Sequence, residues 1–328
     1  MGACKRLLLA VAAAAMIWTV FEPEPGLAQS SGVGGDGYTR MLWRRTDSSI
    51  SLWKLDPSLN MVSVTNYGPY TGWFPIALTT APNNNTYMLW NSYNGMISLW
   101  MLDVNLNFVN SKTYGPYTGY IAQGLSVGSG TNNNFRVIWR EYDGTASIWN
   151  VDSNLNMVNS PQYGPYISYD PGSPYPAAQT SGIGGDGYTR MLWRRTDSSV
   201  SLWKLDPNLN MVSVSNYGPY TGWFPIALCT APNNNTYMLW NGYDGRATLW
   251  QLDSNLNFVN STIYGPYTGY LAQGLSCGTA TTDNSFRVIW REYDGTASIW
   301  YVNSNLNMTN SPQYGPYISY DPVPVSPY

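Results

Sequence analysis

The sequence predicts an all-β fold, a six-bladed β-propeller of four-stranded blades, from three observations. Twelve of the 15 tryptophans form pairs ten residues apart, and successive pairs begin 47 to 54 residues apart along the 328-residue chain. This period is typical of propeller blades and solenoids. Residues 31–60 return almost unchanged at 181–210, so two near-identical halves of three units follow one another. No segment has a sustained 3.6-residue apolar period, so we expect no helix.

The tryptophan pairs mark the two central strands of each unit. They are Trp43/Trp53, Trp90/Trp100, Trp139/Trp149, Trp193/Trp203, Trp240/Trp250 and Trp290/Trp300. The stretch WREYDGTASIW, at 139–149 and again at 290–300, places a turn dipeptide between two β-rich segments. Because Asp-Gly supplies the positive φ of a tight hairpin, we expect the paired rings roughly opposite each other across it. We interpret these rings as core, and sugar-stacking platforms are the alternative.

The second unit illustrates the order of elements that the other units repeat. Its expected segments are a strand at 73–78, a turn at 83–85, a strand at 86–91, a hairpin turn at 94–95, a strand at 97–102, a turn at 103–107 and a strand at 108–114. The first and last units are as typical as the middle ones. A linear β-solenoid needs capping units of different sequence, so a closed ring is favoured.

The N-terminus predicts a secretory signal at residues 1–28. Lys5 and Arg6 precede an apolar run from Leu7 to Phe21, and the small residues before Gln29 offer a cleavage site after Ala28. An uncleaved membrane anchor is the alternative, but a run of about 15 residues is short of the roughly 20 that a span needs. We expect a secreted, cell-surface or periplasmic protein with a bacterial export signal and no membrane span after cleavage.

One propeller domain is expected at 29–328. Its blades lie near 29–70, 71–117, 118–166, 167–220, 221–267 and 268–317, followed by a C-terminal tail at 318–328. How the ring closes is left open.

The repeated LWR…DG..SIW…N.N pattern resembles the FG-GAP/VCBS-type repeats of secreted bacterial β-propellers, from Gly34 to about Tyr317. The resemblance implies the propeller fold, but such propellers host adhesion, lectin and enzyme roles. Members of that group often have Asp-rich calcium loops. The matching loops here, at 34–37, 82–85, 131–134, 184–187, 232–235 and 281–284, hold at most one carboxylate each. A calcium ion needs several oxygen ligands, so we expect no metal and no cofactor.

Composition argues against several functions. Charged residues are 11% of the chain and the net charge is −3, which gives no electrostatic basis for nucleic-acid binding. The absence of His removes the commonest general base and metal ligand. Outside the repeats the acidic candidates are few: Glu141, Glu292, Asp170 and Asp321. Because Glu141 and Glu292 sit half a ring apart, no catalytic residues and no enzyme are predicted.

One carboxylate position recurs in nearly every unit. It is occupied by Asp56, Asp103, Asp152, Asp206 and Asp253, and by Asn303 in the sixth unit. A residue that Asn can replace in this way is interpreted as a turn former that hydrogen-bonds its own backbone.

Two repeated features are candidate ligand-binding residues. The first is the YGPY motif at each handover between blades, which comprises Tyr67, Tyr70, Tyr114, Tyr117, Tyr163, Tyr166, Tyr217, Tyr220, Tyr264, Tyr267, Tyr314 and Tyr317. The second is the position after each first tryptophan, occupied by Arg44, Asn91, Arg140, Arg194, Asn241 and Arg291. Arg, Asn and Tyr can hold sugar hydroxyls by hydrogen bonds. Structural interpretations, such as rigid turns at Gly-Pro and salt links, stand beside both.

Two cysteines distinguish the halves. Cys229 replaces Thr79 and Cys277 replaces Val127, so the second half gained both together. A disulfide between consecutive units, taken as the fourth and fifth, is one interpretation, since an exported chain can hold one. Two independent buried thiols are the other.

Sixfold repetition of Tyr, Trp and Asn, low charge and an export signal favour a secreted, non-catalytic, lectin-like carbohydrate-binding module. The alternatives are a structural or adhesive protein with a surface-protein partner and, less favoured, an enzyme with a site in the central channel. The expected partners are therefore glycans or a surface protein. The sequence does not indicate an oligomeric state.

Overall fold

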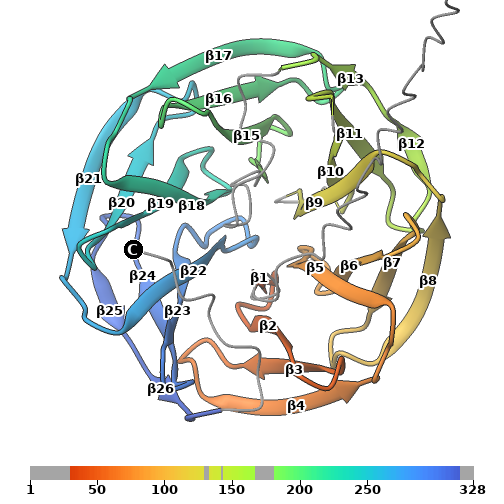
Figure 1. Ribbon diagram of the computed structural model, residues 1–328. Coiled ribbons are helices and arrows are strands. Elements are labelled where there is room, and N and C mark those ends of the chain that lie inside the picture. Colours follow the sequence, from red (N-terminus) through yellow and green to blue (C-terminus); the bar gives the residue numbers. More distant parts are fainter. Residues whose placement is uncertain (1–29, 129–132, 142, 167–180, 318–328) are drawn as a thin grey trace, which may run out of the picture.

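The computed structural model describes residues 30–128, 133–141, 143–166 and 181–317. Six antiparallel sheets are arranged in a ring around a central axis (Figure 1). The described residues form strands and turns and no helix, which confirms the predicted six-bladed propeller. Within these ranges there is accordingly no helix long and apolar enough to cross a membrane. The predicted signal, the tail, Asp170 and Asp321 lie outside the described residues.

In each blade the strands lie in the order of the sequence, from the central axis outward. The innermost strands are β1 (Ser30–Val33), β5 (Trp73–Thr80), β9 (Tyr120–Val127), β14 (Ser181–Ile183), β18 (Trp223–Thr230) and β22 (Tyr270–Cys277). The second strands are β2 (Thr39–Arg44), β6 (Thr86–Ser92), β10 (Phe135–Glu141), β15 (Thr189–Arg194), β19 (Thr236–Gly242) and β23 (Phe286–Glu292). The third strands are β3 (Ile50–Leu55), β7 (Ile97–Leu102), β11 (Ala146–Val151), β16 (Val200–Leu205), β20 (Ala247–Leu252) and β24 (Ala297–Val302).

The outermost strands run along the circumference (Figure 1). They are β4 (Met61–Tyr67), β8 (Phe108–Tyr114), β12 (Met157–Asn159), β17 (Met211–Tyr217), β21 (Phe258–Tyr264) and β25 (Met308–Asn310). In blades three and six the outer edge continues as a separate short strand, β13 (Gln162–Tyr163) or β26 (Gln313–Tyr314). Pro161 and Pro312 separate the two pieces because proline has no N–H to donate to a strand ladder.

The ring closes between blades six and one. Each innermost strand contacts the next, and β22 contacts β1. Val33 forms a parallel bridge with Gly278, and the Thr279 hydroxyl donates to the Val33 carbonyl at 2.7 Å. Further out, the Asn310 side chain donates to the Ser58 carbonyl at 2.9 Å. The first and last described blades therefore meet through ordinary inter-blade contacts.

Ten of the twelve paired tryptophans are buried core residues, as the sequence predicts, whereas Trp100 and Trp250 are partly buried. The first ring of each pair is 1 or 2% exposed, and the ring centroids of the six pairs lie 4.5 to 5.2 Å apart. The register differs from the expectation, because Trp43 pairs with Ser51, and Trp53 with Met41. The rings are thus diagonal neighbours, not opposite ones, and such neighbours are still within reach of aromatic side chains.

The hydrophobic core lies between blades and is repeated around the ring. Leu192 and Leu202 of blade four, for example, form one cluster with Leu228 and Trp240 of blade five. Since each blade is covered by a neighbour on both sides, a central strand such as β3 is buried at every residue. The stacking explains why these strands read as apolar runs and lack a polar face.

The repeated Asp position forms turns, as predicted. In the five Asp copies the backbone N–H four residues later donates to the carboxylate at 2.7 to 2.9 Å. Asn303 accepts the same bond in the sixth blade, at 3.0 Å. These turns hold a leucine at positive φ, and the six leucines are Leu59, Leu106, Leu155, Leu209, Leu256 and Leu306.

The two cysteines form a disulfide with a Cα–Cα distance of 5.6 Å. Cys229 lies on β18 and Cys277 on β22, so the bridge links the innermost strands of blades five and six. The sequence-based assignment of this bridge to units four and five is wrong by one unit, because β18, which contains Cys229, belongs to the fifth blade.

Candidate functional site

The first tyrosine of each YGPY motif reaches the next blade. The hydroxyl groups of Tyr67, Tyr114 and Tyr217 donate to the carbonyls of Leu106, Leu155 and Leu256 at 2.8, 2.6 and 2.7 Å. Tyr163, Tyr264 and Tyr314 make the same bond to Leu209, Leu306 and Leu59. The last of these bonds spans the closure of the ring. Burial raises the pKa of Tyr163, Tyr264 and Tyr314 to about 12.

The second tyrosine of the motif packs on the tryptophans of the next blade. Tyr70 meets Trp90 and Trp100 edge-on, with ring centroids at 5.5 and 5.4 Å. Its own N–H donates to the Ser48 carbonyl in the hairpin of its blade at 3.1 Å. Tyr117, Tyr220 and Tyr267 repeat the ring contacts at their interfaces, and Tyr166 and Tyr317 pack edge-on against Trp203 and Trp53. The motif joins blades, and ligand binding by its tyrosines stays a prediction.

The polar residues after the first tryptophans also point into blade interfaces. The Asn91 amide donates to the Ala122 carbonyl at 2.9 Å, and Asn241 does the same to Ala272. Arg140 and Arg291 are 4 and 2% exposed, and the Arg291 guanidinium lies over the Trp43 ring of blade one. Arg44 and Arg194 are half-buried. This burial leaves Arg140 and Arg291 little surface for a sugar.

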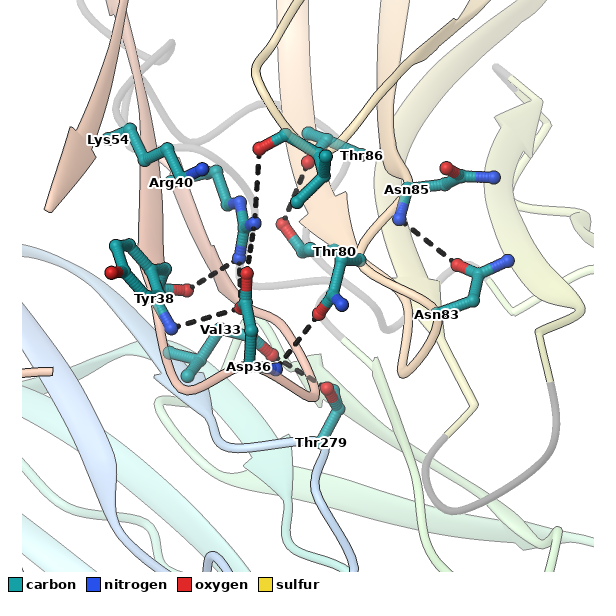
Figure 2. A network of polar contacts seen from close by, with 12 residues as sticks. Val33, Asp36, Tyr38, Arg40, Lys54, Thr80, Asn83, Asn85, Thr86 and Thr279 are labelled. Carbon is teal, nitrogen blue, oxygen red and sulfur yellow. Dashed lines mark hydrogen bonds and ion pairs between the residues drawn. The ribbon is translucent and has the colours of Figure 1, made fainter. Parts of the chain in front are cut away.

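A polar network ties blades one and two near the turns that join first and second strands (Figure 2). The fully buried Arg40 donates to both carboxylate oxygens of Asp36, at 2.6 and 2.7 Å. The Asp36 N–H donates to Asn84 of blade two at 2.9 Å. Burial opposes ionisation of Asp36, but the hydrogen bond and the charge of Arg40 lower its pKa overall. Asp186 and Arg190 repeat this network in the second half, so we interpret it as structural.

A different cluster lies near the start of the inner strands of blades three and six. In blade six the Gln313 amide donates to the Tyr270 hydroxyl at 3.0 Å. The hydrogen bond to the Glu292 carboxylate is the main cause that raises the pKa of Tyr270. Tyr120, Glu141 and Gln162 repeat the arrangement in blade three, with the amide bond at 3.1 Å. We call these two clusters the triads.

The triads lie at the surface between blades. Tyr270 packs on the hydrophobic cluster shared by blades five and six, and Tyr120 on the cluster shared by blades two and three. Both glutamates are half-buried, and both glutamines are exposed. Tyr293, next to Glu292, is 53% exposed. Each triad therefore presents a carboxylate and an amide beside aromatic rings, the groups that typically hold sugar hydroxyls.

The positions equivalent to a triad are different at two other interfaces. Between blades one and two they are Trp73, Ser92 and Thr113, and between blades four and five Trp223, Gly242 and Ile263. At the remaining two interfaces the inner-strand position lies outside the described residues. Among the described residues no group of three His, Cys, Asp or Glu side chains could hold a metal ion.

The triads were only partly foreseeable. Glu141 and Glu292 stand out in the sequence because they break the sixfold repeat, whereas the sequence analysis does not identify the other triad residues, which are Tyr120, Tyr270, Gln162 and Gln313. The available signal was the Ser-Pro-Gln-Tyr segment that precedes Gly-Pro only in blades three and six. There Pro interrupts the edge strand, and the following Gln reaches across the sheet.

Comparison with protein families gives a match to the family described as Ataxin-1 like, at residues 79–137, 186–248 and 236–313. Together these segments span more than half of the 328 residues. The chain belongs to the Ataxin-1 like family. The third matched segment, residues 236–313, includes all three residues of the blade-six triad. The FG-GAP/VCBS-type repeat that the sequence resembles is a different family, and that repeat type stays a prediction.

Solved structures of low sequence identity share the fold of this Ataxin-1 like chain. AofleA from Arthrobotrys oligospora superposes with a TM-score of 0.62 at 10% identity, over 89% of this chain and 88% of its own. The BP39L lectin from Burkholderia pseudomallei gives 0.59 at 14%, over 88 and 99%. The SapL1 lectin in complex with alpha methyl fucoside gives 0.57 at 12%, over 92 and 99%. No curated protein matches the Ataxin-1 like sequence.

Proposed function

We propose that this chain is an exported, non-catalytic carbohydrate-binding propeller that holds sugars at the two triads. The observation that carries the proposal is the Tyr–Glu–Gln arrangement, in which a tyrosine accepts from the glutamine and is paired across the strands with the glutamate, in both halves. The lectins BP39L and SapL1, which share the fold at low identity, agree with this function. Export rests on the predicted signal at 1–28.

The hydrogen bonds within a triad determine what it offers a ligand. The Tyr270 hydroxyl accepts a hydrogen bond from Gln313, and Glu292 is its cross-strand partner and raises its pKa. Glu292 keeps acceptor lone pairs, and Gln313 keeps a carbonyl acceptor and a second N–H. Adjacent sugar hydroxyls, which both donate and accept, match this set.

Catalysis is not part of the proposal. The chain has no His, and its two triad glutamates belong to interfaces three blades apart. A general acid and base must both reach one substrate.

A glycan array with the mature chain tests this function. We expect binding of neutral glycans, and a loss of more than tenfold in the double variant E141Q/E292Q, because the acceptors are weakened. Sialylated or sulfated glycans should bind less well than neutral ones, since Glu292 and Asp294 both place negative charge near Tyr270. D47N, which removes the same charge from the hairpin of blade one, is the control. No binding on the array, or full binding by the double variant, would contradict the proposal.

A protein partner is the second candidate function, favoured by the outer strands. Val62, Val158, Val212 and Val259 are 54, 62, 54 and 54% exposed on four different blades. A contiguous exposed apolar patch typically marks a protein contact, and Val62 and Val64 are exposed together on one face of β4. A pulldown that recovers one partner, together with silence on the glycan array, would favour this function.

A further inference from the structure

Resting on the proposed function, we propose that the two triads act together, so that one chain attaches to a glycan-dense surface through two sites on the same face of the disc. The two triads contain the same three residue types. Their positions in the ring determine whether one surface can occupy both. The partner is thus a surface that presents many copies of one neutral sugar, and a single soluble sugar binds only weakly.

Strand direction places both triads on one face. Tyr120 is the first residue of β9 and Tyr270 the first residue of β22, and each pairs with the last residue of the second strand. Neighbouring inner strands run in the same direction, as the parallel bridge between Val33 and Gly278 illustrates at the seam. All inner strands of a propeller therefore start on the same face, and so do the two triads.

The duplication separates the triads across the ring. Three blades lie between the blade-two to blade-three interface and the blade-five to blade-six interface, which is half of the six-bladed ring. Figure 1 shows β9 and β22 on opposite sides of the axis. One sugar cannot contact both triads, whereas two sugars displayed on one surface can.

Rigid spacing makes the second binding event intramolecular. Within a ring closed by packed interfaces, the position of one triad is fixed once the other is occupied. Two linked sites of this kind gain about 10² to 10⁴ in avidity over either one without any new contact. Because both triads face the same way, a single chain does not bridge two surfaces.

The test uses the full mature chain and the α-methyl glycosides of fucose, galactose, mannose, glucose and N-acetylglucosamine. For the glycoside that binds most tightly, calorimetry should give two equal sites. E141Q and E292Q should each leave one site with its Kd unchanged within about twofold, and the double variant none. Q162A and Q313A replace these variants if either glutamate change lowers Tm.

A second measurement uses the same glycoside immobilised at low and high density. Dissociation of the unchanged chain should slow by about 10²-fold or more at high density, and the single variants should lose this gain. Addition of the monomeric chain to vesicles coated with the glycoside should not aggregate them, because both triads bind the same vesicle.

The outcomes separate this inference from the proposed function. One site, six sites, dissociation that does not depend on density, or aggregation of the vesicles by the monomer would overturn paired attachment while leaving sugar binding intact. Six sites would indicate the YGPY tyrosines instead. Failure of every glycoside to bind would overturn both.

Discussion

At the scale of single residues, most polar side chains that look available in the sequence are used to join blades. The first tyrosine of each YGPY motif, Asn91 and Asn241 donate to backbone carbonyls of the next blade. Buried carbonyls need such partners, because an unsatisfied buried acceptor costs free energy. The triad residues, to which we propose that a ligand binds, break this sixfold pattern.

The inter-blade bond of Tyr67 should contribute measurably to stability. Its hydroxyl donates to the Leu106 carbonyl and accepts from the Phe108 N–H at 2.9 Å, so Y67F removes two hydrogen bonds. We expect the free energy of unfolding to fall by about 1–2 kcal/mol in urea titrations. Y93F is the control, since Tyr93 is 61% exposed and should change stability by less than about 0.5 kcal/mol. Equal effects of the two changes would contradict this role.

Alkaline pH should destabilise the fold through the same tyrosines. Tyr163, Tyr264 and Tyr314 have pKa values of about 12 in the fold, above the ordinary value of 10.0. Between these values the unfolded chain loses its protons first, so the stability that is complete below pH 10 is lost as the pH rises toward 12. Thermal unfolding at pH 9 to 12 measures the slope. The triple variant Y163F/Y264F/Y314F should flatten it, and an unchanged slope would refute the assignment.

At the scale of elements, a disulfide distinguishes the innermost strands of blades five and six from those of blades two and three. The disulfide there closes a 48-residue separation, while the first half has Thr79 and Val127 at the same positions. A cross-link of this length restricts the unfolded chain, which stabilises the fold. The second triad lies at this cross-linked interface, and the first does not.

Replacing the cysteines by the residues of the first half isolates the effect of the bridge. C229T/C277V should lower the free energy of unfolding by about 2–4 kcal/mol, measured in guanidinium chloride. The single variants control for the loss of each side chain and should resemble the double variant, since each breaks the same bond. A double variant as stable as the original chain would show that the bridge contributes nothing.

At the scale of the whole molecule, the interface that closes the ring repeats hydrogen bonds of the interface between the halves. Tyr163 bonds to Leu209 where the halves meet, and Tyr314 bonds to Leu59 at the closure. Asn159 and Asn310 likewise donate to Asn208 and Ser58. Two copies of one half could therefore form the same six-bladed ring.

Residues 177–328 produced alone should form a symmetric dimer. Three blades leave two apolar interfaces open, and pairing two copies covers both with closed symmetry. Light scattering should give twice the mass of the fragment, and β-rich circular dichroism should persist. A stable monomer at micromolar concentration would contradict equivalent interfaces, as would open-ended polymers.

The fold could be predicted from the sequence because every blade repeats the same local signals. The Trp spacing, a polar hairpin turn between the paired tryptophans and the Asp or Asn turn after them each indicate the same strand order. The side to which Arg140 and Arg291 point could not be predicted, because a central strand covered on both sides has no polar face to reveal its orientation. The triads could not be predicted either, because Gln162 and Gln313 reach their tyrosines from the short edge strands β13 and β26.

The diagonal tryptophan pairs have an optical consequence. Two indole rings 4.5 to 5.2 Å apart and tilted by 36 to 43° are close enough for their electronic transitions to couple. Each hairpin therefore contains its own chromophore pair, and the coupled ultraviolet signal exists only while the two strands are in register. Unfolding could be followed by this signal without a dye or label.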